Sequence, residues 1–165
     1  IQRRKGIMEM VQAMRRLTDD VRLVIVGSTT EPAFHKEVLG SIDALGLPDR
    51  IIFAGGQPHE KVPLYLNAAD VSILASYWEG SPNAVVESLA CGTPVVATPV
   101  GSIEEQVRPG MNGIIIPMKD PEALGEAIRK ALDAEWDREK IAKSVRSWDA
   151  VAERVPQVFR GVLGG

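Results

Sequence analysis

The sequence has little cysteine, no long apolar run and no strong excess of charge of either sign. Cys91 is its one cysteine, which excludes an intrachain disulfide and fits a reducing compartment such as the cytoplasm. No apolar run approaches the roughly 18 residues of a membrane-spanning helix, and no signal peptide is recognisable. The net charge is only -3, which argues against a nucleic-acid-binding surface. We therefore expect a cytoplasmic protein without nucleic-acid or membrane-spanning function.

The remaining composition is that of an ordinary globular protein. Hydrophobic residues make up 45% and charged residues 25% of the 165 residues, so neither a disordered nor a fibrous class is indicated. This length suits one domain with a real hydrophobic core. The sequence begins at Ile1 rather than at a methionine. We expect residues 1–165 to form one domain cut from a longer protein.

Short β-branched segments alternate with helical patterns along the chain. The predicted strands are Val21–Gly27, Arg50–Gly55, Val71–Ser76, Pro94–Pro99 and Gly113–Pro117. The predicted helices are Gly6–Arg16, Pro32–Leu45, Pro58–Asn67, Pro82–Cys91 and Pro121–Ala134. Strands that are apolar on both faces belong in a parallel sheet with helices on each side. The expected fold class is α/β, a doubly wound parallel sheet of Rossmann-like type.

Two parts of this expected fold fall outside the regular alternation. A strand that should precede the first helix is not in the sequence. The tail, Trp136–Leu163, predicts one or two further helices, with Trp148 and Phe159 as packing anchors. No internal repeat or interdomain linker is visible.

The segment "EGSPNAVVE" from Glu79 to Glu87 is the most informative loop. In a doubly wound sheet, ligands bind beyond the carboxyl ends of the strands, and this segment follows such an end. Ser81 is predicted as the N-cap and Pro82 as the first helical residue, which leaves backbone N–H groups and the positive end of the helix dipole facing the ligand cleft. Gly80 to Asn83 therefore predict an anion-binding turn. Elsewhere, Asp120 is predicted as the N-cap of the helix Pro121–Ala134, and Gly92 as the residue that ends the helix Pro82–Cys91.

Glu87 is a charged residue at the centre of an otherwise apolar helical run. A carboxylate placed among apolar residues needs a partner, and its sequence neighbours supply none, so a ligand is the favoured partner. Helical spacing puts Asn83 and Glu87 on one face, with Cys91 below them. A carboxylate accepts two hydroxyl hydrogen bonds side by side, as vicinal ribose hydroxyls require.

The stretch "EGSPNAVVESLACGTPVVATPVGSIEEQV" resembles the retaining, family 4 glycosyltransferases, and specifically the C-terminal, nucleotide-sugar-binding half of their GT-B fold. The resemblance covers nearly the whole chain, from "RRKG" through "FAGGQPHEKVPLYLNAADVSILAS" to "PGMNGIIIPMKDPEAL". It implies that Glu79 contacts the donor sugar near the reacting carbon, that Glu87 holds the ribose, and that Lys5 holds the diphosphate. A partner arginine of the family would lie upstream of Ile1.

The same resemblance implies further donor contacts. Gln57, after "FAGG", lies where the family's backbone reads the nucleobase, and Gly27 opens the turn after a strand, here "GST". Ser81 departs from the aromatic residue often found after "EG". No metal ion or other cofactor is expected, because no paired aspartates or His/Cys cluster point to a metal, so basic residues are expected to neutralise the diphosphate. The implied partners are the donor, a glycan or lipid acceptor, and an N-terminal domain of the same protein, through which alone a peripheral membrane association would arise.

Several other interpretations stay open. Glu79 and Glu87 also fit a surface residue and a capping residue, and Lys5 fits a solvated basic terminus. Trp78 fits either a sugar path or a packed loop. A signalling receiver domain shares the alternating pattern, but it needs a phosphoacceptor aspartate after its third strand, whereas Asp70 precedes its strand. A nucleotide-sugar epimerase, a phosphorylase half or a noncatalytic nucleotide-binding module remains an alternative, because a fold does not fix a function.

Overall fold

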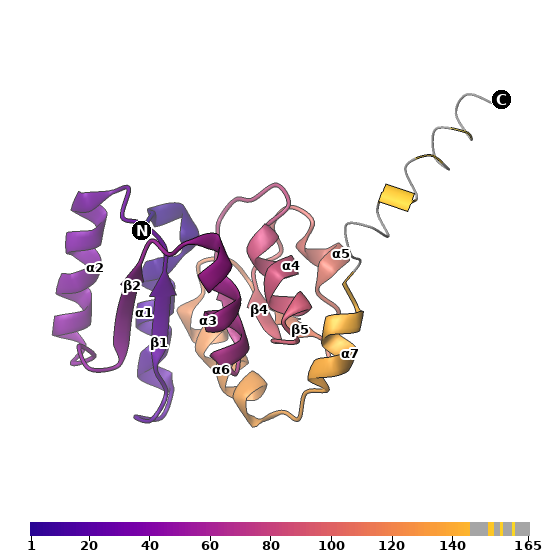
Figure 1. The fold of residues 1–165 in the computed structure, drawn as a ribbon. Helices are drawn as coiled ribbons and strands as arrows, with labels where there is room; N and C mark the ends of the chain where they lie inside the picture. Colours follow the sequence, from indigo (N-terminus) through magenta and orange to yellow (C-terminus); the bar gives the residue numbers. More distant parts are fainter. Residues whose placement is uncertain (146–151, 154–155, 157–159, 161–165) are drawn as a thin grey trace.

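The computed structural model describes residues 1–145, 152–153, 156 and 160, and within them the chain forms an α/β structure (Figure 1). The strands are β1 (Leu23–Val26), β2 (Ile51–Gly55), β3 (Ser72–Leu74), β4 (Val95–Ala97) and β5 (Gly113–Ile115). Each lies inside a predicted strand, and every pairing is parallel. The predicted fold class is therefore confirmed.

The strands form two sheets where the sequence predicted one. β1 pairs with β2, and β3, β4 and β5 pair in that order. In the usual strand order of this fold, the strand before the first helix lies between the strands that follow the first and third helices. Those strands are β1 and β3, and the described residues contain no strand before the first helix. The lack of that central neighbour accounts for the division.

Helices connect the strands in the predicted order. The α-helices are α1 (Ile7–Ala13), α2 (Pro32–Ala44), α3 (Val62–Ala68), α4 (Asn83–Ala90), α5 (Ile103–Gln106), α6 (Pro121–Asp133) and α7 (Arg138–Lys143). The 3-10 helices are η1 (Arg3–Lys5), η2 (Met14–Arg16) and η3 (His59–Lys61). Helix α7 confirms helix at the start of the tail, whereas Trp148 and Phe159 lie outside the described residues.

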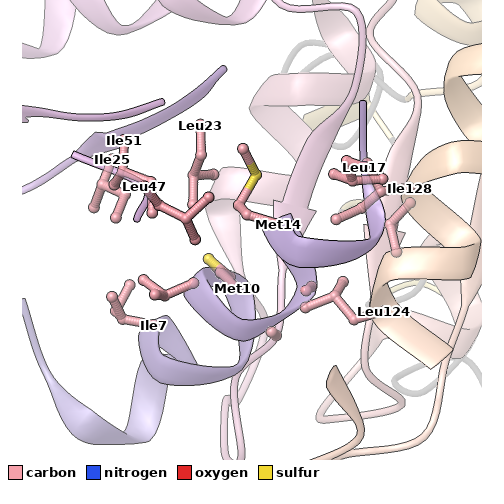
Figure 2. Close-up of a cluster of buried hydrophobic side chains, with 14 of the residues drawn as sticks. Ile7, Met10, Met14, Leu17, Leu23, Ile25, Leu47, Ile51, Leu124 and Ile128 are labelled. Carbon is pink, nitrogen blue, oxygen red and sulfur yellow. The ribbon is translucent and has the colours of Figure 1, made fainter. Parts of the chain in front are cut away.

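Helices cover the strands on two sides, as the doubly wound fold requires. Alternate residues of β4 show this arrangement, because Val96 belongs to one buried cluster while Val95 and Ala97 belong to another. The first cluster joins α1, α2 and α6 to the strands, and Figure 2 shows Met10 of α1 and Met14 of η2 among its side chains. The second joins α4, α5 and α7 to β3 and β4. The two clusters form the core that supports the loops at the carboxyl ends of the strands.

Helix ends follow local chemistry, with one correction. The Asp120 carboxylate accepts hydrogen bonds from the N–H groups of Glu122 and Ala123, which confirms it as an N-cap. Gly92 follows the α4 C-cap with φ +74°, a conformation that suits glycine and ends the helix. The prediction for α4 was wrong by one residue, because Pro82 has extended ψ of 105° and is itself the N-cap. No helix in the described part of the chain is long and apolar enough to cross a membrane.

Candidate active site

The segment Arg4–Gly6 docks onto the loop that follows β3. Gly6 has φ +67°, and a Cβ atom at this position would overlap the carbonyl oxygen of Ala75. The backbone N–H of Tyr77 donates to the carbonyl oxygen of Arg4 over 2.8 Å. The Arg4 guanidinium donates to the carbonyl oxygen of Trp78 over 3.3 Å. Glycine is thus required at position 6, because only glycine tolerates both the dihedral angle and the close backbone approach.

This docking brings Glu79 to Lys5. The Lys5 ammonium donates to Oε1 of Glu79 over 2.6 Å, and the Ser76 hydroxyl donates to the same oxygen over 2.8 Å. The Arg4 guanidinium lies 3.6 Å from Oε2. The Glu79 side chain is only 11% exposed, whereas Lys5 is 37% exposed. A partly buried carboxylate is therefore held by two cations and a hydroxyl at the carboxyl edge of the sheet.

The environment of Glu79 favours its charged form. Burial raises the pKa of this carboxyl, but the hydrogen bonds from Lys5 and Ser76 and the charges of Lys5 and Arg4 lower it by more. The net result is a pKa below the ordinary value. Glu79 is thus an anionic hydrogen-bond acceptor at neutral pH rather than a proton donor.

Two of the partners of Glu79 were missed from the sequence. Arg4 belongs to the basic stretch beside Lys5 that also fits a solvated terminus, and Ser76 ends a predicted strand. Their positions carried a usable signal, because Arg4 adjoins Lys5 and Ser76 lies three residues before Glu79 in a turn, within reach of its carboxylate. Local side-chain contacts of this kind are hard to distinguish from exposure without the fold.

The turn after Glu79 is fixed by the loop that follows β4. The N–H of Ser102 donates to the carbonyl oxygen of Gly80 over 3.0 Å. Gly101, at φ +56°, packs so closely that an added Cβ would overlap this same oxygen. The Ser81 hydroxyl lies 3.1 Å from the hydroxyl of Ser102 and accepts from the Gln106 amide over 3.3 Å. Ser81 thus bonds to the N-cap and last residue of α5 instead of capping α4.

Asn83 begins α4 at the same edge and is exposed. The first N–H groups of a helix have no intrahelical acceptor, and Pro82 has no N–H group. The N–H of Val85 already donates to the carbonyl oxygen of Pro82 over 3.1 Å. Of the first three N–H groups of α4, those of Asn83 and Ala84 are therefore left without an acceptor among the described residues.

Glu87 lies one turn further along α4 and is half-buried. Among the described residues, its carboxylate makes no hydrogen bond or ion pair, and Glu79 and Lys5 contact each other without it. Cys91 lies one turn below it, and burial together with the charge of Glu87 raises the pKa of that thiol, against a smaller opposing effect of Arg138. Glu87 is therefore neither sealed against the sheet nor fully solvated.

Gly27 and Gln57 lie in a second group, at the ends of β1 and β2. The N–H of Gly27 donates to the carbonyl oxygen of Gly55 over 2.8 Å. The Gln57 amide donates to the carbonyl oxygen of Ala54 over 2.5 Å, so this side chain is already engaged with its own turn. The amino terminus of Ile1 donates to the carbonyl oxygen of Ser28. Residues 1–6 therefore contact the carboxyl ends of both sheets.

The structure brings Lys5 and Glu79 into contact. Of the other predicted residues, Gly80, Ser81 and Pro82 follow Glu79 in the same loop, Asn83 and Glu87 lie on α4, and Gly27 and Gln57 follow β1 and β2. An open pocket of about 420 Å³ lies elsewhere, between the end of α1, α2 and α6. No group of three or more His, Cys, Asp or Glu side chains suited to a metal ion occurs within the part of the chain that is described.

Comparison with known proteins identifies the family of this chain. Residues 1–148 match the family described as glycosyl transferases group 1. The D-inositol 3-phosphate glycosyltransferase of Acidothermus cellulolyticus is 38% identical over 153 residues, which are 86% of this chain and 33% of that protein. The chain thus spans about a third of that relative's length.

Solved structures share the fold over most of this chain. The sucrose-phosphate synthase of Thermosynechococcus elongatus superposes with a TM-score of 0.83 and 30% identity, over 99% of this chain and 43% of that one. Anabaena HepE in complex with UDP-glucose gives a TM-score of 0.77 and 27% identity, over 93% of this chain and 42% of that one. The chain belongs to the glycosyl transferases group 1 family.

Proposed function

We propose that this chain is the C-terminal, donor-binding half of a retaining GT-B glycosyltransferase, which moves a hexose from a nucleoside-diphosphate sugar to a glycan, lipid or small-molecule acceptor. The observation that carries the proposal is the contact of Lys5 with Glu79 at the carboxyl edge of the sheet. In this contact Lys5, the proposed diphosphate ligand, lies beside Glu79, the proposed sugar ligand. The UDP-glucose bound to the similar HepE structure supports the same class of donor.

Lys5 has the capacity for both partners. Its ammonium carries three donors, one of which points to Glu79, and its side chain is 37% exposed. When a sugar–diphosphate bond breaks, negative charge gathers on the phosphate oxygens. Fixed cations and helix N–H groups then stabilise the transition state more than the ground state. In this proposal Lys5 and the backbone of Gly80–Asn83 supply that stabilisation, and no metal or other cofactor takes part.

The other predicted residues are proposed to contact different parts of the nucleotide-sugar donor. Glu79, anionic and fixed in place, accepts hydrogen bonds from the sugar near the reacting carbon. Glu87, which has no partner among the described residues, accepts two hydrogen bonds from the ribose. The turns at Gly27 and Gln57 contact the base side of the nucleotide.

The other partners follow from the length of the relatives. The Acidothermus relative and the sucrose-phosphate synthase structure are two to three times as long as this chain. We propose that an N-terminal domain of the longer protein closes over the donor and selects the acceptor. This chain alone is then expected to bind nucleoside diphosphates with dissociation constants between about 1 μM and 1 mM, and to transfer no sugar.

The test is a saturation-transfer NMR screen of this chain against UDP, GDP and ADP, followed by calorimetric titration. Lys5→Met should weaken binding of the preferred nucleotide about tenfold, because it removes a charge-assisted contact worth about 1.4 kcal/mol or more. Lys36→Met is the matched control, because Lys36 is exposed on α2 and should leave the affinity unchanged. Binding of none of the three nucleotides, or equal losses in both variants, would contradict the proposal.

A second experiment separates the proposal from its alternatives. The longer protein is mixed with labelled nucleotide-sugars and an acceptor mixture, and the fate of the sugar is followed by mass spectrometry and NMR. Transfer with retained anomeric configuration supports the proposal. Inversion at a carbon of the sugar while it stays on the nucleotide indicates an epimerase. Formation of a sugar 1-phosphate indicates a phosphorylase, and an unaltered donor indicates a binding module.

A further inference from the structure

Tyr77 lies between Ser76 and Glu79 in the loop after β3, and three other elements hold it. Its backbone N–H donates to the carbonyl oxygen of Arg4 in η1 over 2.8 Å. Its hydroxyl donates to Oε1 of Glu9 in α1. The ammonium of Lys119, in the segment after β5, lies 5.1 Å from the centre of its ring.

Glu9 is used in an unusual way for a helix carboxylate. One oxygen accepts from Tyr77, while the other, Oε2, is buried without a partner among the described residues. An unpaired buried carboxylate oxygen is unfavourable for stability. A role in folding alone therefore does not account for Glu9, since an apolar side chain at this position would avoid the penalty.

We infer that Tyr77 and Glu9 form a positioning pair, which fixes the Ser76–Glu79 segment on α1 so that the Glu79 carboxylate meets Lys5. The Glu9–Tyr77 contact and the Lys5–Glu79 contact link the same two segments of chain, one on each side of Gly6. The Cα atom of Gly6 is packed against Ala75 between them. This inference rests on the proposed function for its consequence in catalysis, but its geometry concerns this chain alone.

The chemistry of the phenol suits a permanent donor. Burial, the hydrogen bond to Glu9 and the charge of Glu9 raise the pKa of Tyr77 to about 12, against a smaller opposing effect of Arg3. The hydroxyl therefore keeps its proton at any physiological pH and continues to donate to Glu9. Neither residue needs to touch a substrate to act in this way.

The test is Tyr77→Phe in this chain, with the titration of the Glu79 carboxyl followed by carbon-detected NMR. Removing the hydroxyl should loosen the segment, weaken the contact with Lys5, and move the Glu79 titration midpoint upward toward the ordinary glutamate value. Tyr65→Phe is the control, because Tyr65 is the other tyrosine of the chain and lies in α3. It should leave the Glu79 midpoint unchanged.

Substitutions of Glu9 provide the second arm. Glu9→Gln retains an oxygen that accepts from Tyr77, so the Glu79 midpoint should not move upward. Glu9→Leu removes the acceptor and should shift the midpoint in the same direction as Tyr77→Phe. The double variant Tyr77→Phe with Glu9→Leu should show no further shift, because both changes break one contact.

The outcomes separate this inference from the proposed function. An unchanged Glu79 midpoint in folded Tyr77→Phe, or an upward shift from Glu9→Gln equal to that from Glu9→Leu, would overturn the positioning pair. Failure of the unaltered chain to bind UDP, GDP or ADP would overturn the proposed function instead. The NMR titration of Glu79 tests the Tyr77–Glu9 pair whether or not the chain binds a nucleotide.

Discussion

The two glutamates of the "EGSPNAVVE" segment lie eight positions apart in very different surroundings. Glu79 is only 11% exposed and is contacted by Lys5, Ser76 and Arg4. Glu87 is half-buried on α4 and makes no hydrogen bond or ion pair among the described residues. The protein itself thus satisfies one carboxylate and leaves the other available.

This difference suggests two roles, a carboxylate fixed in position at Glu79 and a carboxylate free to bind a ligand at Glu87. A group that acts near a breaking bond benefits from a fixed orientation, which partners on neighbouring elements provide. A group that holds a ligand needs unused acceptor capacity, and removing it should leave the fold intact. If this interpretation is right, mutations near Glu79 disturb stability and electrostatics, whereas mutations at Glu87 disturb nucleotide binding alone.

The largest expected effect follows from breaking the docking that holds Glu79. Gly6→Ala places a methyl group against the carbonyl oxygen of Ala75 and forces alanine to φ +67°. We expect it to lower the free energy of unfolding by about 3 kcal/mol, the combined cost of a left-handed alanine and a steric overlap. Chemical denaturation followed by circular dichroism measures this change.

Gly40→Ala is the control for this substitution. Gly40 lies inside α2, and a Cβ there meets no atom within 4 Å. Alanine should stabilise the chain by about 0.5 to 1 kcal/mol through its better helix propensity. Similar effects of the two substitutions would mean that the contact between Gly6 and Ala75 is not rigid.

The second prediction sharpens the comparison at Glu87. If this carboxylate holds ribose hydroxyls, Glu87→Gln loses the charge-assisted part of those hydrogen bonds and should weaken nucleotide binding by about 1 to 2 kcal/mol. All nucleotides should be affected alike, because ribose is common to them. Isothermal titration with UDP, GDP and ADP measures the loss.

Glu104→Gln is the matched control, because Glu104 is an exposed glutamate in the first turn of α5. It should leave nucleotide affinity unchanged, and neither substitution should alter the free energy of unfolding appreciably. Unchanged affinity in a folded Glu87→Gln chain would show that the family's ribose contact has been assigned to the wrong residue.

The third prediction concerns the pH dependence of stability at Glu79. Burial raises the pKa of this carboxyl, but its contacts with Lys5, Ser76 and Arg4 lower it by more, so its folded pKa is below the ordinary value of about 4.5. The carboxylate therefore stabilises the fold fully above pH about 4.5, and this contribution is lost as the pH falls through the folded pKa. The difference in unfolding free energy between the unaltered chain and Glu79→Gln should shrink below about pH 4.5. A difference that grows with acidity would contradict it.

Much of this fold was predictable because its determinants are local. Short β-branched runs closed by Gly, Pro or Ser predicted all five strands, and Asp120 predicted the start of α6. The start of α4 was less predictable, because Ser81 has two uses. Its hydroxyl is able to cap a helix, but contacts with Ser102 and Gln106 from α5 engage it instead.

The site was predictable only in part for a similar reason. Lys5 and Glu79 came from the family's pattern, and the structure brings them together. Ser76, Arg4, Tyr77 and Glu9 were not recognised, because their contacts join segments about 70 residues apart or depend on the shape of one turn. The division into two sheets is equally non-local, since it depends on which strands lie beside one another.

The last prediction has the smallest expected effect and tests both halves of the comparison together. Glu79→Gln should change the affinity of this chain for a free nucleoside diphosphate by less than about 0.5 kcal/mol, because the proposed contact of Glu79 is with the sugar and is made mainly in the transition state. Lys5 remains in place to bind the phosphates. In the longer protein that we propose, the same substitution should lower kcat while KM for the donor changes little. Calorimetry on this chain and steady-state kinetics on the longer protein measure the two quantities. A loss of nucleotide affinity equal to that of Glu87→Gln would mean that both carboxylates contact the nucleotide, and the distinction between a fixed and an available glutamate would then fail.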